Sequence, residues 1–339
     1  MTNSKLNIGI IGAGRIGRVH AETIAFRVPE ANAAAITDLN QSAAEAVAAR
    51  CGIPVVAASA DQIFDDPDID AVLICSSTNT HADLTIQAAR ARKHIFCEKP
   101  IDHDLAKIDA ALDAVAQAGV KLQIGFNRRF DPNFARVRAA VESGEIGSPR
   151  LLHIISRDPA PPPVSYVKVS GGIFLDMTIH DFDMARFLIG DEVEEIYTAA
   201  GVMVDPAIGE AGDLDTALIV LKFRSGVIGT IDNCRQAAYG YDQRAEILGS
   251  LGKIATENCY PNEATISTGQ AISHDLPYNF FMDRYTESFS REVRSFVQAV
   301  VDDTPTLVAG IDGRIPVVMG LAARKSFDLK RPVRLDEIK

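Results

Sequence analysis

Three groups of residues have types and spacings that suit chemistry. The first is Gly12-Ala13-Gly14-Arg15-Ile16-Gly17, which follows a short apolar stretch and opens an amphipathic one. In that context Gly12 makes a tight turn, Gly14 lets backbone N–H groups approach a pyrophosphate, and Gly17 allows a helix to pack closely on a strand. Asp38 ends the next apolar stretch, 21 residues after Gly17, where a carboxylate accepts hydrogen bonds from ribose hydroxyls. The combination predicts a dinucleotide site.

The residues around Asp38 favour NAD over NADP. A carboxylate repels a 2′-phosphate, and the following Leu39 and Asn40 supply no arginine to offset that repulsion. The alternative is a turn that needs glycine for backbone reasons alone, with Asp38 capping the following helix.

The second group is Cys97-Glu98-Lys99-Pro100, at the carboxyl end of a predicted strand. Ligands of open α/β sheets bind outside the carboxyl ends of the strands, so Lys99 is expected beside the cofactor. The alternative for Lys99 is a solvated surface charge without a function in catalysis. For Glu98 two roles stay open: it accepts a hydrogen bond on the cofactor side, or it is a structural partner of Lys99.

The third group is Asp176, His180 and Asp183, which are four and three residues apart. On a helix such spacing brings the three side chains near one face. His180 is then able to take a hydroxyl proton near neutral pH, at the wall of a cleft. The alternatives are a helix cap with a satisfied histidine, and a metal site. The metal site is disfavoured because no thiolate or further imidazole lies nearby in the sequence.

The elements that position these groups change character along the chain. Up to about residue 125 short apolar strands alternate with amphipathic helices, which is typical of βαβ units and a doubly wound parallel sheet. The expected strands are 7–11, 33–37, 71–75, 93–97 and 121–125, and the expected helices are 16–26, 41–50, 81–92 and 105–119.

After about residue 148 strands follow one another through tight turns, which indicates an antiparallel sheet in an α+β domain. The expected strands are 152–157, 214–224, 227–234, 245–248 and 253–256, and the expected helices are 133–143, 178–189, 288–301 and 312–329. The predicted domains are 1–126, which binds the dinucleotide, and 127–339, the α+β domain, to which the resemblance given below assigns substrate binding and oligomerisation.

Composition narrows the class of protein. The chain has 339 residues, 47% of them hydrophobic and 23% charged, which is typical of a folded protein of about two domains. A net charge of −11 disfavours nucleic acid and anionic membrane surfaces as partners. Five widely spaced cysteines suggest neither a disulfide framework nor a zinc knuckle. The start Met1-Thr2-Asn3-Ser4-Lys5 has no signal-peptide pattern, and no apolar run is long enough to span a bilayer, so a cytoplasmic protein is expected.

Taken together these residues resemble a known family. The Gly12–Gly17 turn, the Glu98-Lys99-Pro100 element and the Asp176-x-x-x-His180 pair look like those of the Gfo/Idh/MocA oxidoreductases, over essentially the whole chain. Within that family the chain is most similar to the inositol dehydrogenases, and the segments that carry this likeness are 125–132, 156–163 and 234–244. The resemblance implies a Rossmann domain, a second domain with a large open, mainly antiparallel sheet, and a homotetramer in which sheets stack between subunits.

The resemblance also implies roles for individual residues. Lys99, Asp176 and His180 match the family's catalytic trio: His180 as acid and base, Asp176 orienting the substrate, and Lys99 hydrogen-bonding the reacting oxygen. The implied cofactor-binding set is Gly12, Gly14, Arg15, Ile16, Gly17, Asp38, Ser76, Thr78, His81, Glu98 and Lys99. The implied substrate-binding set is Lys99, Asn127, Arg157, Asp176, His180, Asp183 and Tyr241, with Ser156 where some members place a histidine. No metal is implied.

The expected reaction is NAD-dependent oxidation of myo-inositol to 2-keto-myo-inositol (scyllo-inosose). The nicotinamide supplies the hydride chemistry, and the protein positions and polarises the alcohol. Two alternatives stay open. One is a dehydrogenase of another cyclitol or of an aldose, such as scyllo-inositol or glucose. The other is a sugar-sensing regulator that binds NAD without turnover.

Overall fold

The computed structural model describes residues 5–339. Its backbone divides into two compact units, one reaching to Phe130 and including Glu287–Val317, the other formed by Asp131–Thr286 and Val318–Lys339. Each unit is built around one large sheet. The residues Met1–Ser4, on which the expectation of a missing signal peptide partly rests, lie outside the described residues.

The sheet of the first unit has six parallel strands in the order β3-β2-β1-β4-β5-β6. The strands are β1 Leu6–Ile11, β2 Ala31–Thr37, β3 Val55–Val56, β4 Ala71–Ile74, β5 His94–Glu98 and β6 Leu122–Gly125. The helices between them are α1 Arg15–Arg27, α2 Gln41–Cys51, α3 Ala60–Phe64, α4 His81–Arg90 and α5 Leu105–Ala118, with a short 3-10 turn η1 at Thr78–Thr80. The predicted doubly wound sheet is confirmed. β3 and α3, of two and five residues, are too short to give a periodic pattern.

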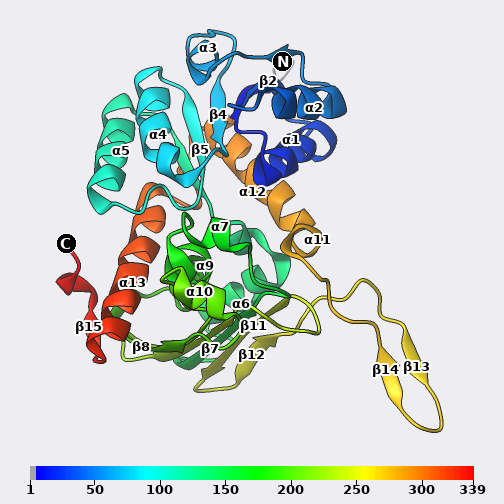
Figure 1. Ribbon diagram of the computed structural model, residues 1–339, viewed down its shortest axis with the longest axis vertical. Helices are drawn as coiled ribbons and strands as arrows, with labels where there is room; N and C mark the ends of the chain where they lie inside the picture. The colour runs from blue at the N-terminus through cyan, green and yellow to red at the C-terminus, as the bar shows by residue number, and fades with distance from the viewer. Residues whose placement is uncertain (1–4) are drawn as a thin grey trace. The chain divides into compact units, whose positions relative to one another are not determined.

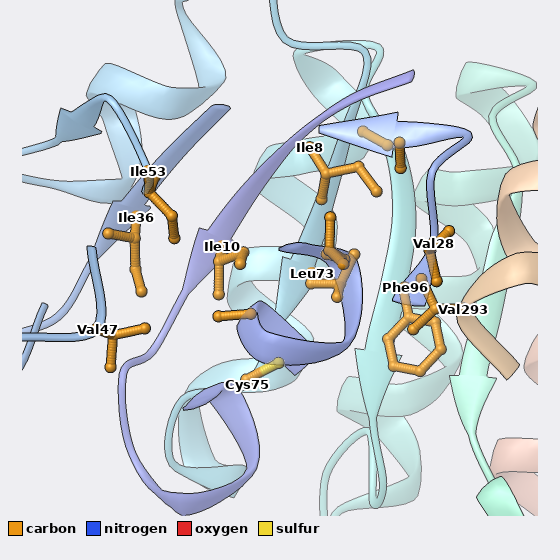
Figure 2. Packing of buried hydrophobic residues seen from close by; sticks show 14 of the residues in the cluster. Ile8, Ile10, Val28, Ile36, Val47, Ile53, Leu73, Cys75, Phe96 and Val293 are labelled. Carbon is orange, nitrogen blue, oxygen red and sulfur yellow. The ribbon is translucent and has the colours of Figure 1, made fainter. Parts of the chain in front are cut away.

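Helices cover both faces of this sheet. In Figure 1, α4 and α5 lie on one side of the strands, and α1 and α12 (Thr286–Val301) lie on the other. The strands are therefore buried on both faces, which explains their continuous Ile, Val and Leu runs. Figure 2 shows Ile8, Ile10 and Leu73 of the strands packed with Phe96 and with Val293 of α12.

The helix α12 belongs to the first unit, although it lies far along the chain from the rest of that unit. The sequence predicts one boundary after residue 126, which places 287–317 in the second domain. In the structure Val293, Phe296 and Val297 are buried in the core of the first sheet, so this segment returns to the first unit. The strong amphipathic pattern of α12 predicts the helix but not the sheet on which it packs.

The sheet of the second unit has seven strands in the order β12-β11-β7-β10-β9-β8-β15. Their bounds are β7 Pro149–Arg157, β8 Val193–Gly201, β9 Thr216–Phe223, β10 Ile228–Cys234, β11 Asp242–Gly249, β12 Lys253–Thr256 and β15 Val333–Arg334. Only the pair β7 and β10 is parallel among the described pairs of this sheet. The predicted mainly antiparallel sheet is confirmed, while β8 and β15 are not predicted.

One face of this sheet is covered by helices and the other is open. Along β7, Leu152, Ile154 and Ser156 are buried, whereas Leu151 and His153 are exposed. In Figure 1 the helices α6 (Pro132–Glu142) and α9 (Thr178–Ile189) lie over the covered face, and the short helix α8 (Gly172–Asp176) directly precedes α9 in the chain. Because successive side chains of a strand point to opposite faces of the sheet, the buried residues of β7 lie on the covered face and the exposed ones on the open face.

The remaining elements are short, apart from the C-terminal helix. They are η2 Asn127–Phe130, α7 Val164–Val167, α10 Pro206–Glu210, β13 Thr265–Ser267, β14 Ile272–His274, α11 Phe281–Arg284, α13 Gly310–Leu329 and η3 Leu335–Glu337. Within the second unit, β13 and β14 form a hairpin that projects away from the large sheet (Figure 1). Across residues 5–339, no helix has the length and apolar character needed to cross a bilayer.

Candidate active site

The turn between β1 and α1 has the shape that a pyrophosphate requires. Gly12 has a φ of +108°, and a Cβ there would lie 2.5 Å from the carbonyl oxygen of Cys75. A Cβ on Gly17 would lie 2.0 Å from the carbonyl oxygen of Gly12. At Gly14, in contrast, nothing described lies within 4 Å of an added Cβ, and no side chain caps α1. The first N–H groups of α1 are thus left without a side-chain cap beside an open Gly14, so these residues suit the pyrophosphate of NAD.

Asp38 holds this turn in place. Its Oδ2 accepts a hydrogen bond from the backbone N of Ala13 (2.6 Å), and its Oδ1 accepts one from the backbone N of Asn40 (2.7 Å). The cap of α2 is Asn40, whose side chain accepts from the backbone N of Ala43. The alternative in which Asp38 caps that helix is therefore wrong. A carboxylate oxygen accepts more than one hydrogen bond, so Asp38 retains acceptors for a ribose.

The other residues predicted around the cofactor surround this turn or lie on the next loop. Arg15 is exposed in the first turn of α1, and Ile16 packs partly against the core. Ser76 and Thr78 follow β4, and the Ser76 hydroxyl lies 2.7 Å from that of Thr80. These positions agree with the carboxyl edge of the sheet, where ligands of such sheets bind.

His81 ties two loops together. Its Nδ1 lies 2.8 Å from the carbonyl oxygen of Pro100, and its Nε2 lies 3.0 Å from that of Ser76. The side chain is buried, with 2% of the residue exposed. His81 therefore joins the loop after β4 to the loop after β5, and its geometry fixes the backbone at both.

Glu98 is directed into a buried polar cluster. Its Oε1 lies 2.6 Å from Nε2 of His20 on α1, so its observed partner is His20. A Cβ on Gly125 would lie 2.9 Å from the Glu98 carboxyl, so glycine makes room for it. Nearby, burial and then the negative charge of Glu98 raise the pKa of Glu292 on α12 well above its usual value. Glu292 is fully buried, and no hydrogen-bond partner among the described residues reaches either of its carboxyl oxygens.

Lys99 directly follows β5 and is half-buried. Burial raises the pKa of the preceding Cys97 to about 12, so that thiol stays neutral and is not a nucleophile. Asn127 also belongs to the first unit, where it opens η2 just after β6 and is buried. Lys99 and Asn127 thus follow adjacent parallel strands at the same edge of the sheet.

Asp176 and His180 lie on either side of a break between two helices. Asp176 ends α8, Met177 forms the break, and His180 lies in the first turn of α9. Asp176 Oδ1 accepts a hydrogen bond from the Tyr166 hydroxyl (2.9 Å), and Oδ2 accepts one from Arg235 Nη1 (3.2 Å). Its side chain is 14% exposed and that of Arg235 is 1% exposed. His180 is half-buried, so an acid-base group near solvent follows the fixed Asp176 carboxylate four residues along the chain.

Asp183 and its neighbour Asp181 are fully buried on α9. Asp181 accepts a hydrogen bond from the Asn233 amide (2.8 Å), and the Asn233 oxygen accepts one from the Thr178 hydroxyl (2.6 Å). The end of β10 therefore anchors the start of α9. The shared helical face of Asp176, His180 and Asp183 stays a prediction. Met177, between α8 and α9, keeps right-handed helical dihedrals (φ −94°, ψ −60°), and Asp183 is buried while His180 is half-buried.

Arg157 lies on the open face of the sheet, in the alternation that places Ser156 on the covered face. Its Nη2 lies 2.5 Å and its Nε 3.1 Å from the two carboxyl oxygens of Asp232, and its Nη1 lies 3.1 Å from the Tyr239 hydroxyl. These hydrogen bonds raise the pKa of Arg157. The face that carries Asp176 and His180 is the other one, so the structure gives Arg157 an ion-pair role, as the sequence leaves open.

Tyr241 is buried beside a second tyrosine. Its ring meets Tyr285 edge-to-face, with centroids 6.0 Å apart. The next residue, Asp242, is fully buried; burial raises its pKa, but hydrogen bonds from Arg244, Tyr239 and Asn258 outweigh this and lower it. Tyr241 thus lies directly before a buried carboxylate that three side chains hydrogen-bond.

Tyr166, Arg235 and Asn233 are the residues of this region that the sequence does not predict. Arg235 lies in the 234–244 segment, yet nothing in its spacing reveals the Asp176 contact 59 residues away. In residues 5–339, no group of three or more His, Cys, Asp and Glu side chains could hold a metal ion.

Comparison with known proteins supplies names for both halves. A family model described as oxidoreductase family, NAD-binding Rossmann fold, matches residues 6–126, and the Gfo/Idh/MocA C-terminal domain model matches residues 134–255. The first unit therefore contains an NAD-binding Rossmann domain, as the glycine turn predicts.

Two bacterial relatives match over nearly the whole length. Myo-inositol 2-dehydrogenase of Thermotoga maritima is 46% identical over 98% of this chain and 99% of its own. Inositol 2-dehydrogenase of Rhizobium meliloti is 46% identical over 97% of this chain and 99% of its own. Among solved structures, scyllo-inositol dehydrogenase of Lactobacillus casei with NAD(H) and scyllo-inositol has a TM-score of 0.92 at 29% identity, over 98% of this chain and 100% of that one.

Proposed function

Because the chain belongs to the Gfo/Idh/MocA oxidoreductase family, we propose that it oxidises myo-inositol at C2 to 2-keto-myo-inositol (scyllo-inosose) with NAD. The observation that carries the substrate is the pair of inositol dehydrogenases that are 46% identical over nearly the full length. The fixed Asp176 and the half-buried His180, four residues apart in the chain, support the chemistry, because alcohol oxidation needs a base for the hydroxyl proton.

Each proposed catalytic residue has one task. A ring nitrogen of His180 accepts the hydroxyl proton near neutral pH. The Lys99 ammonium donates a hydrogen bond to the reacting oxygen and stabilises the negative charge that develops there. Asp176 orients the substrate and favours the protonated form of His180. NAD, when bound, accepts the hydride from the alcohol carbon.

The substrate pocket that we propose takes Asn127, Asp183 and Tyr241 in addition to the trio. Amide, carboxylate and phenol groups suit a ring that presents a hydroxyl on every carbon. For Arg157 a substrate role stays a prediction, because its guanidinium is engaged by Asp232 in this structure. The cytoplasmic location and the homotetramer also stay predictions.

The test follows NADH absorbance with purified protein, NAD and a panel of polyols. The panel is myo-inositol, scyllo-inositol, D-chiro-inositol, glucose, galactose and xylose, each repeated with NADP. We expect the highest kcat/KM on myo-inositol with NAD. The variant Lys99→Ala should lose turnover by at least about 100-fold while it still binds NAD, because electrostatic stabilisation of this kind contributes about 10²–10³-fold.

Other outcomes correct the proposal. A higher kcat/KM on scyllo-inositol, which the Lactobacillus casei structure holds, would move the substrate and keep the mechanism. Binding of NAD and polyol without any NADH would favour a sensor instead of an enzyme. Near-normal turnover of Lys99→Ala would remove Lys99 from the mechanism.

A further inference from the structure

A fully buried guanidinium lies against the proposed catalytic carboxylate. Arg235 follows β10 directly and is 1% exposed. Its Nη1 lies 3.2 Å from Oδ2 of Asp176, and its Nη2 lies 3.8 Å from Oδ2 of Asp213. Burying an arginine is costly unless anions pair with it. Its location therefore indicates a specific task at these two carboxylates.

Two sets of hydrogen bonds hold the backbone around Arg235 in place. Its N–H donates to the carbonyl oxygen of Asp215 (2.8 Å). Two residues earlier, the Asn233 side chain bonds to Thr178 and Asp181 on α9. The end of β10 is thus fixed to α9, the helix that carries His180, and the backbone of Arg235 is held in place by these hydrogen bonds.

The two carboxylates that Arg235 contacts lie at opposite ends of α8. Asp213 Oδ1 accepts a hydrogen bond from the backbone N of Ile173 in the first turn of α8 (3.0 Å). Gly172 has a φ of +77°, and a Cβ there would lie 2.6 Å from the same Asp213 oxygen. Asp176 is the last residue of α8. Arg235 therefore fixes the helix as well as the side chain at its end.

The second oxygen of Asp176 is held independently. Tyr166 donates its hydroxyl to Oδ1 at 2.9 Å, while Arg235 takes Oδ2. With both oxygens engaged, the Asp176 carboxylate cannot rotate without breaking one of the two bonds. A reacting group misplaced by about 1 Å loses roughly 10²-fold in rate, so such fixation has a measurable effect.

We propose that Arg235 is a positioning residue that orients the Asp176 carboxylate, with Tyr166 as its counterpart on the other oxygen. The proposal rests on the catalytic role of Asp176 in the proposed function. Arg235 is too deeply buried to touch a substrate, so its effect on the rate passes through Asp176.

A double-mutant cycle in the complete protein tests this. Arg235→Met, Asp176→Asn and the double variant are compared with the unchanged chain for kcat on myo-inositol and for the KM of NAD. We expect Arg235→Met to lower kcat about 100-fold with the KM of NAD nearly unchanged. In the Asp176→Asn background the same change should lower kcat by less than about threefold, because coupled residues are not additive. Arg235→Lys should restore part of the rate.

Arg186→Met is the matched control. Arg186 is also a buried arginine of this unit, and it pairs with Glu192 (2.7 and 2.8 Å) instead of Asp176. We expect its kcat to stay within about threefold of the unchanged chain. An equal loss from Arg235→Met in both Asp176 backgrounds would overturn the proposal, because it would show a merely structural role.

Two further measurements keep the test decisive. If Arg235→Met does not fold, Tyr166→Phe replaces it in the cycle, since Tyr166 is 48% exposed and the substitution keeps the ring. Tyr166→Phe should lower kcat in the unchanged chain and should have no effect on kcat in the Asp176→Asn background. If the unchanged chain oxidises no polyol, the proposed function fails, and the cycle is then measured by thermal unfolding. There, Tm changes that are non-additive for Arg235 and Asp176 support the pairing, and additive changes refute it.

Discussion

Glu98 and Asp176 share one feature: each carboxylate is held by a side chain far along the chain. Glu98 pairs with His20, 78 residues away, and Asp176 with Arg235, 59 residues away. Spacing along the sequence reveals residues that share a helix face, and it predicts Asp176 and His180 as neighbours. Spacing does not reveal which other elements pack against these carboxylates in the fold, so neither His20 nor Arg235 is predicted as a partner.

Glu292 gives a prediction on stability. Its pKa in the folded protein is raised, first by burial and then by Glu98, while the unfolded chain has the ordinary value near 4.3. The favourable contribution of the neutral form is complete below that value and is lost as pH rises toward the folded pKa. Over this range the free energy of unfolding should fall by up to about 1.4 kcal/mol per pH unit.

The change that tests this is Glu292→Gln, which keeps the shape and removes the titration. Urea unfolding between pH 5 and pH 7 should show a flatter pH dependence for Glu292→Gln than for the unchanged chain. Glu287→Gln, on the exposed side of α12 beside Arg291, is the control and should keep the original slope. Equal slopes for all three proteins would show that Glu292 is ionised when folded.

At the scale of elements, most helices and strands of the first unit are predicted, because βαβ units combine clear periodicity with glycine and capping signals. β8 is not predicted, because Val193–Gly201 is an outer strand with Glu194, Glu195 and Tyr197 on its surface. The helix α9 has the predicted bounds, 178–189, whereas α8 is not predicted, because five residues are too few to give a periodic pattern.

Two matched glycine substitutions in the turn between β1 and α1 distinguish an effect on folding from an effect on cofactor binding. Gly17→Ala places a methyl group 2.0 Å from the Gly12 carbonyl oxygen, so we expect a lower Tm by several degrees. Gly14→Ala meets nothing within 4 Å, so its Tm should stay unchanged. Its methyl group instead enters the space proposed for the pyrophosphate, so the Kd of NAD should rise about tenfold or more.

Thermal unfolding and NAD titration by fluorescence measure both variants. Normal NAD affinity in Gly14→Ala would show that the pyrophosphate lies elsewhere. An unchanged Tm in Gly17→Ala would show that α1 can move away from β1 without cost.

At the scale of the whole molecule, the open face of the second sheet carries an apolar patch. It consists of Leu151, Tyr197, Leu218, Val220, Ile228 and Leu248, each between 37% and 52% exposed. Patches of this kind mark interfaces between proteins. The homotetramer expected from the sequence would bury it, with sheets stacked face to face.

Val220→Lys tests the assembly, because Val220 pairs with Tyr197 on β8 and Thr230 on β10 near the centre of the patch. Light scattering after size exclusion should give a tetramer for the unchanged chain and smaller species for Val220→Lys. Val301→Lys places the same charge on the exposed last residue of α12 and should leave the mass unchanged. A tetramer that persists in Val220→Lys would place the interface elsewhere.

The proposed reaction transfers a hydride from C2 of myo-inositol to NAD. The most direct measurement uses myo-inositol that carries deuterium only at C2, with mass spectrometry of the reduced cofactor. We expect deuterated NADH, a slower rate than with unlabelled myo-inositol, and a keto-inositol without deuterium. Unlabelled NADH from that substrate would contradict oxidation at C2, and no reduced cofactor at all would contradict inositol as the substrate.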